Sequence, residues 1–167
     1  LCRFVFRKLV AWREVNEFVE KVTKTKKFTE KELWIIRIGG YFSAFVHRNE
    51  NRADGSKYIT HPLAVAEIII FEFQVFDLET ILAAIFHDNA ENSGWSWGTM
   101  FFVMEKISND RVPSFVFFLS KHYITAFGRV YFEMLYWARI IRVILVKLAD
   151  RTHNLRTLEF MSIQSQW

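Results

Sequence analysis

Apolar residues recur along most of this chain at the three- and four-residue intervals of an amphipathic helix. The run 143–146 has the composition of a short strand, but the apolar periodicity continues beyond it, which favours a long helix. A basic run at 21–27 predicts a solvated connector after the first helix. The pattern predicts helices over residues 4–19, 30–47, 61–73, 78–91, 97–106, 113–121, 127–137 and 139–158. The predicted fold class is therefore all-α.

Polar and small residues mark the ends and contacts of several predicted helices. Thr29 precedes acidic first-turn residues and Asp77 precedes the most apolar helix, so both are expected to be N-caps. Thr60 is expected to cap the helix that carries Pro62 in its first turn, where proline is tolerated. The pair Gly39-Gly40 weakens a helix interior and therefore predicts close packing or a kink.

The composition fits a single globular domain over residues 1–167, with 51% hydrophobic and 24% charged residues. The longest apolar run, 81–86, is far shorter than the ~18–20 residues of a membrane span, and Arg3 and Arg7 interrupt any signal peptide. The single Cys2 cannot form an internal disulfide, so a reducing, cytoplasmic location is expected. The net charge of +4 is scattered, so no direct nucleic-acid binding and no membrane partner are expected.

Two histidines and two carboxylates stand out as candidates for chemistry. His87 and Asp88 lie in the most apolar predicted helix, where an ionised carboxylate is costly unless it is paired or bound to a metal. Asp150 ends another apolar run, and His61 begins a helix after a polar loop. Two imidazoles and two carboxylates form a plausible donor set for a divalent transition metal.

Further polar residues follow these four at helical spacing. Glu91 and Asn92 come one turn after the His-Asp pair, where they can flank whatever the metal binds. Asn154 and Thr157 come one and two turns after Asp150, on the same face. This arrangement is typical of a site between facing helices of a bundle.

Three ordered segments carry a family resemblance: His47–Glu67, Ile81–Glu91 and Arg142–Leu158. They resemble, in the same order, the opening motif, the His-Asp helix and the third motif of the HD-type hydrolase domain of RelA/SpoT homologues. The third segment is similar almost residue for residue. The resemblance covers the chain from about 40 to 160 and implies an all-α HD-domain helical bundle with a central metal site.

The resemblance implies a metal-dependent enzyme, usually with Mn²⁺, that hydrolyses the alarmone (p)ppGpp to pyrophosphate and GDP or GTP. Long family members continue into an attached synthetase domain, so the chain is expected to be an N-terminal fragment of such a protein or a small single-domain hydrolase. By matched motif positions, the implied metal ligands are His61, His87, Asp88 and Asp150. The implied catalytic pair is Glu91 and Asn92, and the implied substrate-binding residues are Arg52, Tyr58, Arg151, Asn154 and Thr157.

Three positions depart from the family pattern. Asn92 replaces the aspartate of the catalytic Glu-Asp pair, and an amide cannot accept a proton at pH 7. Ala53 replaces a lysine expected near the substrate phosphates. Asn49-Glu50 replaces Gly-Gln and is expected to add a negative charge close to an anionic ligand.

Two alternatives stay open. Asn92 and Ala53 favour a catalytically weakened regulatory module that binds metal and nucleotide without much turnover. Arg52 and Asn154 favour a nucleoside ligand without fixing its base, so another phosphorylated nucleotide such as NADPH is also a candidate substrate.

Overall fold

Helices make up the regular structure of the residues that the computed structural model describes, which are 12–92, 94–120 and 140–158. No strand occurs among them, only an isolated bridge between Asn51 and Lys57. The prediction of an all-α fold is confirmed. The elements are α2 (Trp12–Lys24), α3 (Glu30–Val46), α4 (Thr60–Glu67), the π-helical turn η1 (Ile68–Glu72), α5 (Leu78–Phe86), α6 (Asn89–Asn92), α7 (Trp97–Ile107), α8 (Arg111–Leu119) and α10 (Ile141–Arg156).

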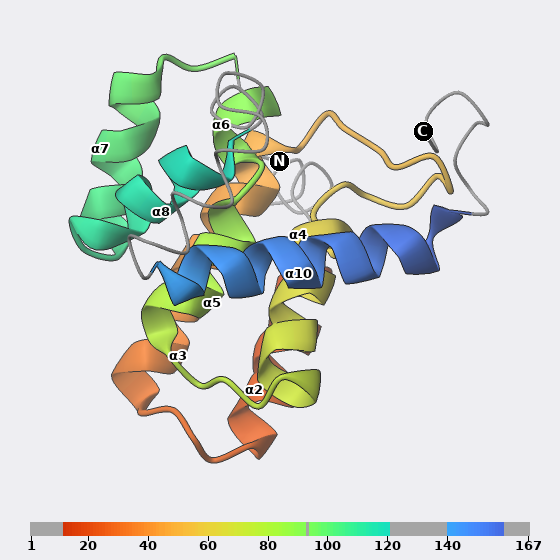
Figure 1. Cartoon of the computed structure of the whole chain (residues 1–167), viewed down its shortest axis with the longest axis vertical. Coiled ribbons are helices and arrows are strands. Elements are labelled where there is room, and N and C mark those ends of the chain that lie inside the picture. Colours follow the sequence, from red (N-terminus) through yellow and green to blue (C-terminus); the bar gives the residue numbers. More distant parts are fainter. Residues whose placement is uncertain (1–11, 93, 121–139, 159–167) are drawn as a thin grey trace, which may run out of the picture.

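Helix α5 forms the centre of the packing. It contacts α3, α4, α8 and α10, and α10 runs across the front of the bundle over α4 and α5 (Figure 1). All residues of α5 from Thr80 to Phe86 are buried. Burying one large apolar side chain contributes roughly 1.5–3 kcal/mol, so this helix anchors the elements around it. Among the described residues, no helix is long and apolar enough to cross a membrane.

Two of the predicted N-caps are confirmed. Thr29 accepts a hydrogen bond from the backbone N–H of Glu32, whose carboxylate accepts one from the backbone of Thr29 in return. Asp77 accepts from the backbone N–H of Thr80, at 3.0 Å. The same carboxylate accepts from Arg142 at 2.7 Å, which ties the start of α5 to the start of α10.

The paired glycines in α3 mark close packing. A Cβ at Gly39 would lie 3.0 Å from a methyl carbon of Leu82, and one at Gly40 would lie 2.7 Å from a methyl carbon of Val15. Helix α3 therefore approaches α5 and α2 so closely that a side chain at either position would force its neighbour to shift.

Several helix boundaries differ from the predictions. Residues 21–24 belong to α2 because Val22 is fully buried, whereas a solvated connector was expected there. Thr60 is the first residue of α4, and Ile59 is the N-cap. The Thr60 hydroxyl donates instead to the carbonyl of Lys57, at 2.8 Å. The predicted helix 127–137 and the first residues of the predicted helix 4–19 lie outside the described part of the chain.

The predicted helix 78–91 is interrupted at its functional residues. Helix α5 ends at Phe86 and α6 begins at Asn89, so His87 and Asp88 lie between two helices and not within one. Adjacent side chains in a continuous helix point about 100° apart. Here both side chains face one site, with Asp88 Oδ2 3.2 Å from His87 Nε2.

Candidate metal centre

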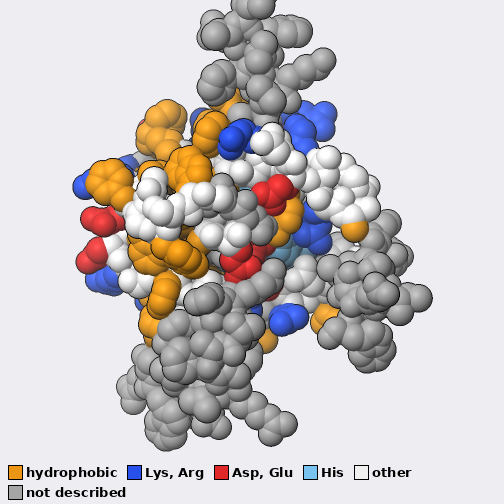
Figure 2. Space-filling model, turned by 90° about the horizontal axis from the view of Figure 1, so that it is seen from above, with side chains coloured by type: hydrophobic (Ala, Val, Ile, Leu, Met, Phe, Trp, Pro, Cys, Tyr) orange, Lys and Arg blue, Asp and Glu red, His pale blue; other side chains and the backbone are white. Residues whose placement is uncertain are grey.

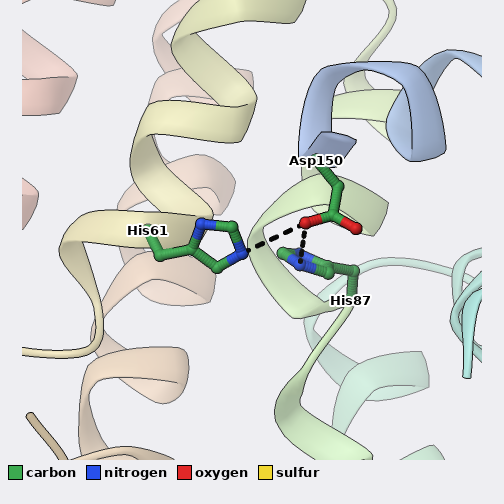
Figure 3. Close-up of side chains that lie close together, drawn as sticks. All are labelled: His61, His87 and Asp150. Atoms are coloured by element: carbon green, nitrogen blue, oxygen red, sulfur yellow. Dashed lines mark ion pairs between the residues drawn. The ribbon is translucent and has the colours of Figure 1, made fainter. Parts of the chain in front are cut away.

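Three separate elements bring His61, His87 and Asp150 together. His61 lies in the first turn of α4, His87 follows α5, and Asp150 lies in α10 (Figure 3). Asp150 Oδ1 is 3.3 Å from His61 Nε2 and 3.8 Å from His87 Nε2. One potential ligand atom from each residue lies within 4.8 Å of the other two, and all three residues are buried. This spacing suits a single metal ion.

Asp88 adjoins this cluster. Its Oδ2 is 3.2 Å from His87 Nε2 and 3.6 Å from His61 Nε2, and it accepts a 2.8 Å hydrogen bond from the hydroxyl of Tyr58. The structure therefore places side by side the four residues that the family resemblance implies as metal ligands.

The ring of His87 is oriented with one nitrogen toward the cluster. Its Nδ1 donates to the carbonyl of Ala84 at 2.7 Å, and a carbonyl can only accept, so Nδ1 carries the proton. The opposite nitrogen, Nε2, is fully buried and has no hydrogen bond of good geometry within the described part of the chain. A buried nitrogen that faces carboxylates and makes no hydrogen bond of good geometry is placed to share a cation with them. The residues present therefore fit a divalent cation.

The ring of His61 has a different neighbour. Its Nδ1 lies 2.9 Å from Nδ1 of His153, and the two rings are 4.9 Å apart. His153 is three residues after Asp150 on α10, so the same helix contributes a carboxylate to the cluster and contacts one of its histidines.

Charges in the cluster shift the pKa of each member. Burial alone would lower the pKa of His87, but the carboxylates of Asp88 and Asp150 raise it to about 9. Burial alone would raise the pKa of Asp150, but the hydrogen bond with His61 and the positive charge of His87 lower it to about 2. The pKa of Asp88 is likewise held far below its ordinary value, against burial, by His87 and Tyr58.

At His61 and His153, unlike His87, burial outweighs the nearby negative charges. It lowers the pKa of His61, and the carboxylates nearby do not restore it. It also lowers the pKa of His153, to about 4, with help from the charges of His61 and Arg52. Two ionised carboxylates therefore face one protonated histidine, and the cluster is arranged to hold positive charge.

A cavity of about 480 Å³ opens beside the cluster. Ligand cavities of roughly 300–1,000 Å³ are common, so this one can take a nucleotide-sized group. Acidic, basic and histidine side chains lie together on the face seen in Figure 2. The cavity is lined by Asn51, Arg52, Ala53, Asp54, Tyr58, His61, Asp88, Glu91, Lys147, Asp150, Arg151, Asn154 and Thr157.

All five residues implied in substrate binding line this cavity. The guanidinium of Arg52 donates to the hydroxyl of Thr157 at 3.3 Å, which links the loop before α4 to the end of α10. The amide of Asn154 donates to Asp150 at 2.7 Å. Asn154 therefore positions a cluster carboxylate as well as lining the cavity.

The implied catalytic pair is only partly described. Glu91 lies in α6 and lines the cavity. Asn92 is the last residue of α6, and its side chain lies outside the described part of the structure.

Two neighbours of the site remain to be placed. Glu50 is not among the residues that line the cavity, and its carboxylate faces His47 Nδ1 at 3.2 Å. Lys147 was missed, although it lies on the Asp150 face of α10 at an i,i+3 interval that could have identified it. Its Nζ is 3.6 Å from Asp150 Oδ2, and it lines the cavity.

Comparisons with known proteins find similar chains, although no family model matches this one. It is 38% identical over 120 residues to the bifunctional (p)ppGpp synthase/hydrolase SpoT of Escherichia coli (strain K12), which covers 67% of this chain and 16% of that protein. It is 34% identical over 157 residues to the GTP pyrophosphokinase of Myxococcus xanthus, covering 86% of this chain and 20% of that protein. It is 35% identical over 121 residues to the guanosine-3′,5′-bis(diphosphate) 3′-pyrophosphohydrolase of Haemophilus influenzae, covering 67% and 17%.

The chain thus spans between 16% and 20% of the length of these curated relatives. Their names include a hydrolase, a pyrophosphokinase and a protein with both activities. The helical fold, the buried His/Asp cluster and this similarity agree with one another. The chain belongs to the RelA/SpoT homologue family, in which it corresponds to the HD-type domain.

Proposed function

We propose that this chain, as one domain over residues 1–167, hydrolyses the 3′-diphosphate of the alarmone (p)ppGpp and releases pyrophosphate and GDP or GTP. The observation that carries the proposal is the convergence of His61, His87, Asp88 and Asp150 beside one cavity. Relatives named for this hydrolysis support it. Because the chain spans only part of those relatives, an attached synthetase domain is proposed as its partner in a longer protein.

The four cluster residues are the proposed ligands of Mn²⁺. Nitrogen and carboxylate oxygen donors in this ratio suit a divalent ion of the first transition row. When bound there, such a cation supplies a Lewis acid that makes water more acidic and offsets negative charge on a phosphate. Hydrogen bonds with Ala84, Tyr58 and Asn154 already hold three of the proposed ligands in place.

Basic side chains of the cavity are proposed to hold the anionic substrate. Arg52, Lys147 and Arg151 all line it. Guanidinium groups bind phosphate oxygens with paired hydrogen bonds, and Lys147 adds a point charge beside Asp150. Arg52 is proposed to lie against the guanine base, with Asn154 and Thr157 on the nucleoside.

In the proposed reaction, the oxygen of a water molecule bonds to the phosphorus that carries the ribose 3′ oxygen. The bond between that phosphorus and the 3′ oxygen breaks, pyrophosphate leaves, and the 3′ oxygen takes up a proton. Glu91 is the cavity carboxylate proposed to accept the proton of the water. Asn92 can hydrogen-bond the water or a phosphate but cannot share in proton transfer.

A second candidate is a regulatory module that binds metal and nucleotide but turns over slowly. It is favoured by Ala53, which lines the cavity without the charge that the family lysine would supply there. Asn92 favours it too, because its amide cannot accept a proton from the attacking water. A substrate with another base, such as NADPH, remains a variant of the first proposal because the described cavity residues do not by themselves select guanine.

A pyrophosphate-release assay tests the proposal. The purified chain is incubated with ppGpp, with and without Mn²⁺, beside an Asp150→Asn variant and an Asp110→Asn control. Asp110 is exposed and makes no side-chain cap bond, so the control repeats the same change at a residue outside the cluster. Metal-dependent release that Asp150→Asn abolishes and Asp110→Asn keeps is the expected result. Bound Mn²⁺ and bound ppGpp without release would favour the regulatory module.

A further inference from the structure

We propose that His153 is a positioning residue for the metal centre: its Nδ1 accepts the Nδ1 proton of His61, so that His61 presents the lone pair of Nε2 to the cation. The inference rests on the metal site of the proposed function. It concerns a residue that neither binds the metal nor touches the substrate in that proposal.

The contact itself limits where the protons can be. The two Nδ1 atoms are 2.9 Å apart, a distance that requires one ring to donate and the other to accept. Each neutral imidazole carries a single N–H. If His61 uses Nε2 as a ligand, its proton must be on Nδ1, and His153 must then be the acceptor with its own proton on Nε2.

The position of His61 Nε2 suits a metal ligand. It faces the carboxylates of two other proposed ligands, Asp150 at 3.3 Å and Asp88 at 3.6 Å, while Nδ1 lies against His153. A ring held at one nitrogen by an acceptor cannot turn without losing that bond. His153 therefore fixes both the orientation and the tautomer of His61.

In this proposal both cluster histidines carry a proton on Nδ1, but each donates it to a different acceptor. His87 donates its Nδ1 proton to the backbone carbonyl of Ala84 at 2.7 Å, within its own segment. His61 finds its partner on α10, 92 residues away in sequence. Packing of α10 on α4 therefore completes the ligand geometry of His61, in addition to delivering Asp150.

His153 lies near the C-terminal end of α10. Its backbone carbonyl accepts from the Thr157 hydroxyl at 3.1 Å, in the last turn of the helix. His153 is half-buried and borders a small surface groove of about 190 Å³ together with Ile68, Phe71 and Arg156.

Two variants of similar size separate the acceptor from the packing. His153→Asn puts an amide oxygen, which can accept a hydrogen bond, close to the position of Nδ1, whereas His153→Leu fills the same space without an acceptor. Binding of Mn²⁺ is measured by calorimetry for the wild type, both variants and Leu155→Ala. Leu155 is exposed on the same helix and serves as the control.

Loss of a hydrogen bond to a ligating histidine typically weakens metal binding about 10–100-fold. We expect His153→Leu to show a loss of this size, and His153→Asn and the control to stay close to the wild type. Nitrogen NMR of the protein loaded with diamagnetic Zn²⁺ is expected to show the His61 proton on Nδ1. Equal affinity of the wild type and His153→Leu, equal losses in both His153 variants, or a proton on Nε2 of His61 would overturn the proposal.

The same measurements separate this inference from the proposed function. Mn²⁺ binding that depends on the acceptor at position 153, without release of pyrophosphate from ppGpp, would support the positioning role and contradict the hydrolase. Absence of Mn²⁺ and Zn²⁺ binding by the folded wild type would overturn both.

Discussion

The hydroxyl of Tyr58 donates a 2.8 Å hydrogen bond to the carboxylate of Asp88. The tyrosine ring is itself fixed, because it stacks on His47 with 4.5 Å between the ring centres. His47 in turn contacts Asn89 at 3.1 Å and Glu50 at 3.2 Å. A chain of contacts thus runs from the loop before α4 to a proposed metal ligand. It also includes Glu50, whose carboxylate faces His47.

Tyr58→Phe is expected to weaken Mn²⁺ binding and to raise the pKa of Asp88. The hydrogen bond stabilises the ionised carboxylate, and bonds to charged groups contribute about 1.5–3 kcal/mol, or roughly a 10–100-fold change in affinity. Calorimetric titration with Mn²⁺ measures the effect. Tyr41→Phe is the matched control, because its hydroxyl donates to Asn16 at 2.7 Å, on α2. A loss of affinity as large in Tyr41→Phe as in Tyr58→Phe would contradict a specific role for Tyr58.

The metal-free protein is expected to lose stability as the pH rises from about 6.5 to about 9. Protonated His87 has a pKa of about 9 in the folded chain and 6.5 as its ordinary value, so the folded state binds the proton more tightly. This contribution is fully present below pH 6.5 and disappears as the pH passes 9. Urea unfolding between pH 6 and pH 9.5 measures it. A free energy of unfolding that stays constant over this range would contradict the assignment, as would an undiminished slope in His87→Gln.

Metal binding is expected to show the opposite dependence on pH. A cation at His87 Nε2 must displace the proton, so the affinity for Mn²⁺ should rise by about tenfold per pH unit up to the pKa of about 9. Mn²⁺ should also release protons, which calorimetry in buffers of different ionisation enthalpy detects. An affinity independent of pH between 6 and 8 would mean that His87 is not a ligand.

Asn92→Asp is expected to raise the rate of ppGpp hydrolysis. The substitution restores a carboxylate beside Glu91, and a positioned general base contributes roughly 10²–10⁴-fold to a rate. The kcat for pyrophosphate release is the measurement. Glu91→Gln, in both backgrounds, shows whether the gain depends on the neighbouring carboxylate. An unchanged or lower kcat in Asn92→Asp would show that the amide is not what limits this chain.

Gly40→Ala is expected to destabilise the fold, and Gly98→Ala to stabilise it. The new methyl at position 40 would lie 2.7 Å from Val15 Cγ1, and such overpacking costs about 1–3 kcal/mol. Apart from its chain neighbours and the backbone of α7 itself, no atom of the described residues lies within 4 Å of a Cβ at position 98, where alanine gains up to about 1 kcal/mol over glycine. Urea unfolding of both variants checks the pair. Equal effects would show that α2 moves away from α3 at little cost.

Local features of the fold could be predicted from the sequence because they depend on neighbouring residues. The capping box of Thr29 and the cap at Asp77 need only a side chain and the first turn that follows it. The apolar period of the chain predicts helices in the same way. The predicted cap at Thr60 was wrong because its hydroxyl donates to the preceding carbonyl of Lys57. The spacing of apolar residues carries no information about this hydrogen bond.

The candidate site also combines features that the sequence predicted with features that depend on the tertiary structure. The sequence by itself determined which residue types could hold a divalent cation, and their motif spacing pointed to His61, His87, Asp88 and Asp150. Tertiary structure alone decided that the helix stops at Phe86. It also decided that His61 meets His153 and that Glu50 faces His47. The first set depends on the identity and order of residues, whereas the second depends on hydrogen bonds and burial between segments distant in the sequence.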